Sequence, residues 1–366
     1  MLSNFLLPPG YQLPITLNSP VFAAPGGGRL LVCSTHDAWR LREHYACESL
    51  SDVQMHISSR EGMRLDIWQS ELDAAHMNAH IHGCSGHESF KEICESLALE
   101  RIGVLQVSFP DGGHSEHCRM LLSGGTDAKT MTARLRPLAE RLGVDIAITS
   151  LKPSPRLSEP GLLLMDMDST LIQCECIDEI ADFMGIKPQI AAITQLSMEG
   201  KLDFAASFSE RVKLLAGLDA SVLQTVLDER IRLTDGAEAL VRGLKAHGWK
   251  TALVSGGFTF YTEHFRQTLG LDFALGNMLE IENGKLTGGY IGDIVDAETK
   301  RRTLLAKTEE WGIPIEQTIA IGDGANDLPM IEAAGMGIAF HAKPRVRELA
   351  PYALSRGGLD RALDLL

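Results

Sequence analysis

The sequence predicts an α/β fold, namely a Rossmann-like parallel sheet with a helical cap insert, preceded by a smaller α+β domain. Three observations predict it. The apolar run Leu162–Met165 leads directly into a pair of aspartates, as a strand buried on both faces of a parallel sheet would. Strand and helix patterns alternate from residue 237 onward. Between these parts, residues 175–233 have a helical period and few strand signals, which indicates an inserted cap.

The first half of the chain predicts an irregular arm and then the smaller domain. Residues 1–28 are rich in Pro and Gly, which predicts an arm without regular structure. Residues 29–151 have α+β patterns, with expected strands at Leu30–Cys33, Val104–Phe109, Arg119–Leu122 and Val144–Thr149 and helices at Phe90–Leu99 and Ala128–Leu142. Residues 152–160 contain three prolines and therefore predict an extended linker between domains.

The second domain is expected over residues 161–366. After the Leu162 strand and the cap, the chain predicts strands at Lys250–Val254, Thr318–Ile321 and Gly337–Phe340 and helices at Ala237–His247, Phe258–Leu269 and Glu298–Trp311. Asn283-Gly284, between two short strand patterns, is a strong signal for a β-hairpin.

Composition and charge exclude several classes of partner. The net charge is −14 and no basic stripe is found, so nucleic acid and anionic membranes are not expected to bind. No run of 18 apolar residues occurs, and residues 1–28 lack the positive start of a signal peptide. Seven cysteines without framework spacing indicate reduced thiols, and we expect a cytoplasmic protein.

The aspartate pair is the first candidate site. Asp166 and Asp168 are spaced i, i+2 at the carboxyl end of the expected strand, where open α/β sheets bind their ligands. Two carboxylates so close repel each other, and a hard cation relieves the repulsion. The pattern therefore predicts Mg²⁺ and an anionic substrate.

Histidines are concentrated in the smaller domain, at His76, His80, His82, His87, His114 and His117. His76 and His80 would share one face of a helix, so a zinc site is one interpretation. No C-x-x-C or H-E-x-x-H motif accompanies them, and we favour the alternative, that these are solvated or core histidines.

Further motifs follow the aspartate pair in a fixed order. They are Ser255-Gly256-Gly257 at a strand end, Lys300 on a helix, and the G-D-G-A-N-D motif over Gly322–Asp327. Together with D-x-D-x-T they resemble the haloacid dehalogenase superfamily of phosphohydrolases, over residues 161–366. Within the expected cap, the sequence resembles the phosphoserine phosphatase family at four positions, Glu175, Met198, Phe204 and Arg211.

The resemblance implies a mechanism and a cofactor. It implies that Asp166 is the nucleophile that forms an aspartyl-phosphate, and that Asp168 acts as general acid and base. Mg²⁺ would be held by Asp166, the Asp168 carbonyl and Asp323, with Asp327 supporting that shell. Ser255 and Lys300 would bind the phosphoryl oxygens, so the implied catalytic residues are Asp166, Asp168, Ser255 and Lys300.

The resemblance also implies the substrate, O-phospho-L-serine, and the last step of serine biosynthesis. Arg211 lies in an apolar stripe, where an arginine usually extends outward to solvent; the resemblance favours a pocket, with the guanidinium on the substrate carboxylate. Glu175 would pair with the ammonium, and Met198 and Phe204 would form an apolar wall. The implied substrate-binding set is Glu175, Met198, Phe204, Arg211, Ser255, Gly256, Gly257, Lys300 and Asn326.

Two alternatives remain open at this point. A phosphotransferase would keep the aspartyl-phosphate and pass the phosphoryl group to another alcohol, such as homoserine. An amino-acid sensor would act through residues 29–151, because an ACT-type domain that binds amino acids can precede the phosphatase in this family. Serine binding at that domain and a homodimer are the further partners that the resemblance leaves open.

Overall fold

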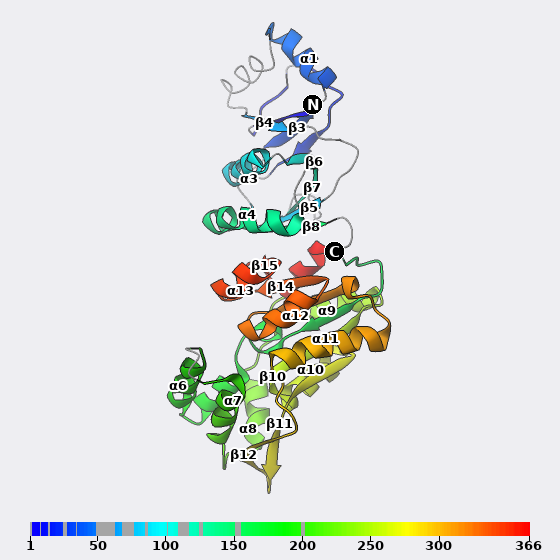
Figure 1. Ribbon diagram of the computed structural model, residues 1–366. Helices are drawn as coiled ribbons and strands as arrows, with labels where there is room; N and C mark the ends of the chain where they lie inside the picture. The colour runs from blue at the N-terminus through cyan, green and yellow to red at the C-terminus, as the bar shows by residue number, and fades with distance from the viewer. Residues whose placement is uncertain are drawn as a thin grey trace. The chain divides into compact units, whose positions relative to one another are not determined.

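The chain divides into two units in the computed structural model, Met1–Pro153 and Ser154–Leu366 (Figure 1). The structure describes residues 2–7, 9–13, 15–24, 28–33, 35–48, 63–67, 77–84, 87–100, 102–108, 117–123, 127–150, 155–198 and 202–366. The boundary lies inside the stretch that the sequence predicts as a linker. No helix within these ranges is long and apolar enough to cross a membrane.

The first unit begins with a four-stranded antiparallel sheet in the order β2-β3-β1-β4. Its elements are β1 (Leu2–Leu7), β2 (Val21–Ala23), β3 (Arg29–Cys33), α1 (Thr35–His44) and β4 (Met63–Ile67). The predicted irregular arm over residues 1–28 is therefore wrong, because β1 is an inner strand of this sheet. Phe5 and Leu7 pack into one apolar cluster and Leu6 into another, so β1 is buried on both faces and has no alternating pattern.

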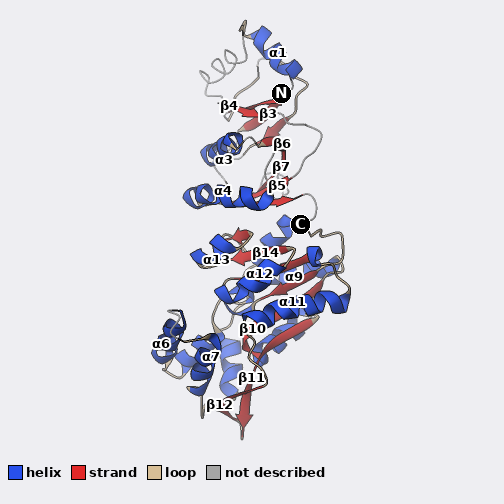
Figure 2. Cartoon of the chain, viewed as in Figure 1, coloured by secondary structure: helices blue, strands red, loops and turns tan. Residues whose placement is uncertain are grey.

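A second four-stranded sheet has the order β6-β7-β5-β8 (Figure 2). Its elements are β5 (Met77–His82), α3 (His87–Leu99), β6 (Gly103–Ser108), β7 (His117–Ser123), α4 (Ala128–Leu142) and β8 (Asp145–Ser150). This order of elements is the ferredoxin-like arrangement. The predicted α+β class is confirmed, and α4 has the bounds that the sequence predicts. The Asp127 side chain caps its first turn, and Gly143 ends it at φ 65°.

The second unit contains a seven-stranded sheet in the order β12-β11-β10-β9-β13-β14-β15. β9 (Leu162–Met165), β10 (Lys250–Phe258), β13 (Thr318–Gly322), β14 (Met336–Phe340) and β15 (Tyr352–Leu354) are parallel. The helices between them are α9 (Ala237–Ala246), α10 (Thr259–Leu269), α11 (Ala297–Trp311), α12 (Leu328–Ala333) and α13 (Pro344–Leu349). This confirms the predicted parallel sheet, with β9 at its centre. The short strand β15 was not predicted.

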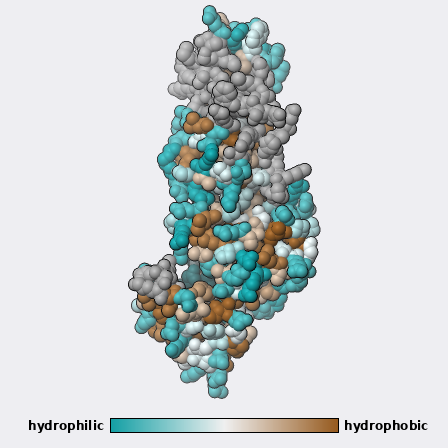
Figure 3. Space-filling view, in the orientation of Figure 1, coloured by the Kyte–Doolittle hydropathy of each residue, from teal (hydrophilic) through white to brown (hydrophobic). Residues whose placement is uncertain are grey.

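The predicted cap is helical and is inserted after β9. It consists of α5 (Cys176–Phe183), α6 (Lys187–Met198), α7 (Phe204–Lys213) and α8 (Ser221–Glu229). The surface view shows hydrophobic side chains over the cap region (Figure 3), where Leu196 and Leu214 are exposed.

A β-hairpin pairs with the chain that follows α7. It consists of β11 (Phe273–Glu282) and β12 (Lys285–Ile291), and its turn residues Asn283 and Gly284 have φ of 50° and 77°, as a type I′ turn requires. Leu286 in β12 donates its N–H to the carbonyl of Leu218, at 2.8 Å. The hairpin that the sequence predicts is thus confirmed, and it supports the cap.

The described part of the linker is bound to the second unit. The Gln317 side chain accepts a hydrogen bond from the Arg156 N–H at 2.6 Å and donates to the carbonyls of Arg156 and Glu159 at 3.1 and 3.0 Å. The indole N–H of Trp249 donates to the carbonyl of Leu157 at 3.2 Å. Residues 156–159 are therefore part of the second unit and not a free tether.

Candidate active site

The carboxyl ends of β9, β10 and β13 meet at one edge of the sheet. On one side, Met165 pairs with Leu253 of β10, two residues before Ser255. On the other side it pairs with Ile321 of β13, two residues before Asp323. The N–H of Asp166 donates to the carbonyl of Ile321 at 3.0 Å. This register brings Asp166, Ser255 and Asp323 together at the topological switch point, where ligands bind in open α/β sheets.

A single tight turn follows Asp166. Its carboxylate accepts the N–H of Met167 at 2.7 Å and so fixes the start of the turn. Ser169 has φ of 54°, a left-handed conformation that is uncommon for a residue with a side chain. Its N–H donates to the carbonyl of Cys174 at 3.1 Å, and its hydroxyl donates to Glu175 at 2.8 Å. The turn is thus held from both backbone and side chain.

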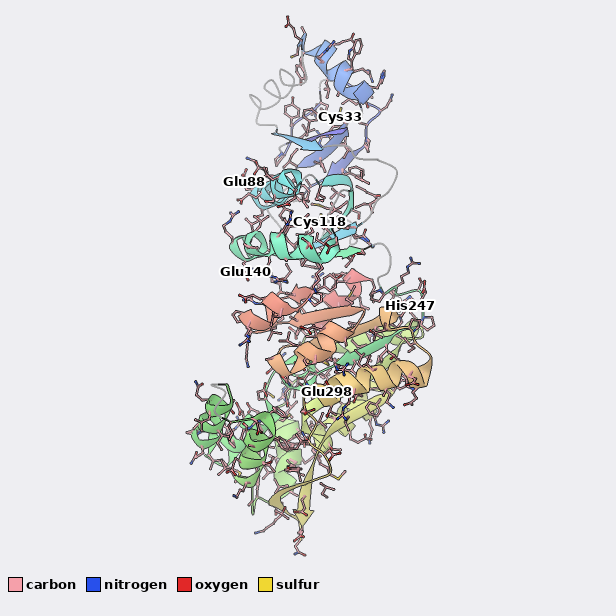
Figure 4. The ribbon with its side chains drawn as sticks, viewed as in Figure 1. Cys33, Glu88, Cys118, Glu140, His247 and Glu298 are labelled. Carbon is pink, nitrogen blue, oxygen red and sulfur yellow. The ribbon has the colours of Figure 1, made fainter. Side chains whose placement is uncertain are left out.

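Lys300, on α11, links two carboxylates inside the protein. Its Nζ lies 2.7 Å from Asp166 Oδ2 and 2.6 Å from Asp327 Oδ1, and the Lys300 side chain is fully buried. Burial alone would lower the pKa of Lys300, but the two carboxylates outweigh it and raise the pKa. Burial and the charge of Asp327 raise the pKa of Asp166 well above its ordinary value. Figure 4 labels Glu298, which lies in the first turn of α11 and so marks this helix.

Three carboxylates lie close enough to hold one cation. Oxygens of Asp166, Asp323 and Asp327 are all within 4.8 Å of one another. Burial, and then Asp327, raise the pKa of Asp323 to about 6. Three ionised carboxylates against the single ammonium of Lys300 leave a charge of −2, which a divalent cation would neutralise. An all-oxygen donor set suits a hard cation such as Mg²⁺.

Asp168 occupies a different position from these three. Its carboxylate accepts the N–H of Cys176 at 3.1 Å, and burial, then Glu175, raise its pKa to about 7. A Cβ atom on Gly257 would lie 2.6 Å from Asp168 Oδ2, so only glycine fits there. The hydroxyl of Ser255 accepts the N–H of Gly257 at 2.8 Å. Asp168 therefore faces the Ser255-Gly256-Gly257 turn.

Asp327 and Asn326 complete the turn after β13. The N–H of Gly324 donates to Asp327 Oδ2 at 2.9 Å, and a Cβ atom on Gly324 would lie 2.2 Å from Asn326 Oδ1. One carboxylate oxygen of Asp327 thus pairs with the Lys300 ammonium, and the other accepts a hydrogen bond from the backbone. This arrangement suits the supporting position that the sequence predicts for it.

The cap brings its predicted residues to the same edge. A Cβ atom on Gly256 would lie 3.2 Å from Phe204 Cζ, so this ring covers the glycine turn. Burial lowers the pKa of Arg211, and the charge of Glu175 is the largest of the effects that oppose this shift. No ion pair to Arg211 is found within the described ranges. Met198 lies in the last turn of α6, and its side chain is outside the described residues.

One contribution to the site was missed by reasoning from the sequence. The backbone N–H of Cys176 carries no motif, so its bond to Asp168 could not be predicted.

The histidines of the first unit do not form the helix face that the sequence suggested. Met77–His82 is a strand, so the helical interpretation of His76 and His80 is wrong. His82 lies opposite His117, and the two buried rings stack with centroids 4.2 Å apart and planes 9° apart. A ring nitrogen of His82 and one of His117 lie within 4.8 Å of each other. His76, His114 and the side chain of His87 lie outside the described residues. His80, His82 and His117 are buried, which agrees with the favoured interpretation of core histidines.

Comparison with known proteins identifies the class of protein first. The model of the haloacid dehalogenase-like hydrolases matches residues 163–332, from β9 to α12. A phosphoserine phosphatase of Haemophilus influenzae is 48% identical over 223 residues, which cover 61% of this chain and 71% of that protein. The chain therefore belongs to the haloacid dehalogenase-like hydrolases. Within them it belongs to the phosphoserine phosphatase family, and it is a phosphatase.

Solved structures agree with this family. A haloacid dehalogenase family hydrolase of Salmonella enterica serovar Typhi has a TM-score of 0.70 and 34% identity, covering 79% of this chain and 98% of that one. That share of the chain exceeds the second unit, so the likeness extends into the first unit. A phospho-aspartyl intermediate analogue of phosphoserine phosphatase has a TM-score of 0.54 and 39% identity, covering 57% of this chain and 99% of that chain.

Proposed function

We propose that this protein hydrolyses O-phospho-L-serine to L-serine and phosphate, as the last step of serine biosynthesis. One observation carries the proposal: the buried Asp166–Lys300–Asp327 set lies beneath cap residues of both charges, Glu175 and Arg211. A phosphate ester, an ammonium and a carboxylate in one small molecule match these groups in kind and number. The names of the curated relatives support the same substrate.

Mg²⁺ is the proposed cofactor. Asp166, the Asp168 carbonyl and Asp323 would hold it, and Asp327 would support the shell. When bound, it would neutralise the charge of the carboxylates and polarise the phosphoryl oxygens.

Asp166 would act as the nucleophile of the proposed reaction. Its carboxylate attacks phosphorus, and the bond to the serine oxygen breaks, leaving an aspartyl-phosphate. Lys300, Ser255 and the amides of the turn after Asp166 bind the equatorial oxygens, where charge develops. The related phospho-aspartyl analogue supports this intermediate.

Asp168 would move the proton in both halves of the reaction. Burial and Glu175 raise its pKa to about 7, so it can carry a proton at neutral pH. It protonates the departing serine oxygen and then takes a proton from the water that hydrolyses the aspartyl-phosphate. Its place beside Gly257, outside the three-carboxylate group, suits that separate task.

The cap would select phosphoserine. Arg211 would take the substrate carboxylate through a charge-assisted pair, and Glu175 would take the ammonium. Phe204 and Met198 would exclude water from the bound ester. A cytoplasmic location is part of the same proposal. It is supported by the lack of any disulfide among the seven cysteines, all of which lie in described residues.

The test is phosphate release from L-phosphoserine against a panel of phosphomonoesters, with and without Mg²⁺. We expect a strong preference for phosphoserine and no turnover in excess chelator. Adding homoserine or another acceptor alcohol tests transfer, because a phosphotransferase would form a new phosphate ester in place of free phosphate. A panel hydrolysed without preference would overturn the phosphoserine assignment. Calorimetry with serine tests binding to the first unit.

A further inference from the structure

The hydroxyl of Ser207 is buried at the cap without a hydrogen-bond partner among the described residues. Ser207 lies in α7, and only 1% of its surface is exposed. Its Oγ makes no hydrogen bond to any residue that the structure describes. Buried polar groups are normally paired, so an unpaired one in a folded protein calls for an explanation, and one such explanation is a ligand.

Other helical hydroxyls in the chain show what Ser207 could do and does not. Ser209, two residues later in the same helix, donates its hydroxyl to the carbonyl of Ala205 at 2.8 Å. Thr194, Thr225 and Thr268 likewise donate to the carbonyl four residues earlier. The equivalent acceptor for Ser207 is the carbonyl of Asp203, which receives only its backbone N–H, at 2.9 Å. The Ser207 hydroxyl is therefore available for another acceptor.

The position of Ser207 indicates what that acceptor is. Phe204 and Arg211 lie on its face of the helix, at spacings of three and four residues. Phe204 covers Gly256, at the phosphate end of the site, whereas Arg211 lies where Glu175 and Asp168 act on its charge. Ser207 stands between these two ends.

Ser207 is also linked directly to Arg211. The Nε of Arg211 donates to the backbone carbonyl of Ser207 at 3.3 Å, which directs the guanidinium along this face. The next residue, Phe208, packs instead against the rings of Phe258 and Tyr290. Ser207 is thus joined to Arg211, whereas Phe208 is joined to aromatic rings.

We propose that Ser207 is a substrate-binding residue whose hydroxyl donates a hydrogen bond to the carboxylate of phosphoserine, beside Arg211. This inference rests on the proposed function. It assigns the carboxylate two donors of different kinds on one helix. It also explains why a buried hydroxyl is left without a protein partner, because its acceptor arrives with the substrate.

The test compares Ser207→Ala with Ser209→Ala in the full chain. On L-phosphoserine, Ser207→Ala should raise KM about 10-fold with a smaller change in kcat, since hydrogen bonds to charged groups are the stronger ones. On an aryl phosphate, which has no carboxylate, its loss should be about 2-fold or less. Ser209→Ala should match the wild type on both. Wild-type turnover of phosphoserine is measured first, so failure of the proposed function is recognised separately.

Thermal unfolding without substrate gives a second readout. Ser207→Ala loses no side-chain hydrogen bond that the structure describes, so its Tm without substrate should equal or exceed that of the wild type. The rise in Tm on adding L-phosphoserine to an Asp166→Asn background should be smaller when Ser207 is also alanine. Equal losses on the two substrates, a lowered Tm without substrate, or unchanged kinetics on phosphoserine would each overturn the proposal.

Discussion

The two ends of the active site are built differently. At the phosphate end, Lys300 and Asp327 are fully buried, and short contacts join them to each other and to Asp166. At the cap end, Glu175 is exposed, and Arg211 makes no ion pair within the described residues. The groups proposed for chemistry are thus held by buried ion pairs, whereas the groups proposed for selectivity are held by single hydrogen bonds, Glu175 from the Ser169 hydroxyl and Arg211 to the Ser207 carbonyl.

Removing the nucleophile should affect every substrate equally. Asp166→Asn keeps the size of the side chain and removes its negative charge, so kcat should fall by roughly 10⁴-fold or more on both phosphoserine and an aryl phosphate. Steady-state phosphate release measures this. Residual activity near the wild-type level on either substrate would contradict the covalent mechanism.

Breaking the buried ion pairs should cost stability as well as activity. Lys300→Met leaves Asp166 and Asp327 without their shared cation, and loss of one partner of a buried pair costs about 3–5 kcal/mol. The free energy of unfolding, from denaturant titration, measures it. The matched control is Arg301→Gln in the same helix, where the exposed pair with Glu298 should contribute less than about 1 kcal/mol. If Lys300→Met lowered the free energy of unfolding as little as Arg301→Gln does, the buried ion pairs would not stabilise the phosphate end.

Removing Arg211 should lower activity through the cap end of the site and leave the phosphate end unchanged. Arg211→Ala takes away a charge-assisted pair, worth ~1.5–3 kcal/mol, so kcat/KM on phosphoserine should fall roughly 10- to 150-fold. The loss on an aryl phosphate should be much smaller, because the contacts at the phosphate end remain. If both substrates lost the same factor, Arg211 would support the cap or the phosphate and not the carboxylate.

Mg²⁺ binding should depend on pH in a stated direction. The pKa of Asp323 is raised to about 6, so in the metal-free protein this group lowers the free energy of unfolding as pH rises from about 4 to 6. The cation needs the ionised carboxylate, so its affinity should rise as the pH rises through about 6. Calorimetric titration at several pH values measures this. Asp323→Asn should bind Mg²⁺ weakly at each pH, and a wild-type affinity that is constant from pH 5 to 7 would count against the site.

The smallest expected effect concerns the linker. A chain that begins at Ser158 loses the Arg156 backbone groups that pair with Gln317, which would leave a buried amide partly unpaired at a cost of about 1–3 kcal/mol. It should therefore melt several degrees below a chain that begins at Ser154. Both should hydrolyse an aryl phosphate, because the hydrogen bonds of residues 156–159 that the structure describes go to Gln317 and Trp249 and not to the proposed catalytic residues. Equal Tm values would show that the Gln317 contacts do not stabilise the second unit.

The sequence predicts the second unit better than the first, for a physical reason. The acidic turns at Asp166 and Asp323 come directly after buried apolar strands. The apolar run therefore predicts the strand, and the acidic motif predicts where the strand ends. In the first unit, β1 is buried on both faces beside a Pro-rich stretch, and β5 carries His80, whose i, i+4 spacing from His76 in the sequence resembles a helix face. Local composition was misleading at both places.

Side-chain networks set a further limit. The contacts of Gln317 with residues 156–159 join positions that are distant in sequence, and neither side carries a motif. The same holds for the closeness of Gly257 to Asp168. Such contacts depend on the tertiary fold, so they are visible only in the structure.

The central place of β9 determines when the active site can form. Leu162 pairs on one side with Lys250 and on the other with Thr318, so the strand that leads to Asp166 gains its neighbours only from much later parts of the chain. Closing such long loops is entropically costly and slows folding. During synthesis on the ribosome, the first unit can fold while β9 is still an unpaired strand. The catalytic edge can be completed only after β13 has emerged, so a nascent chain that ends before it has no assembled site.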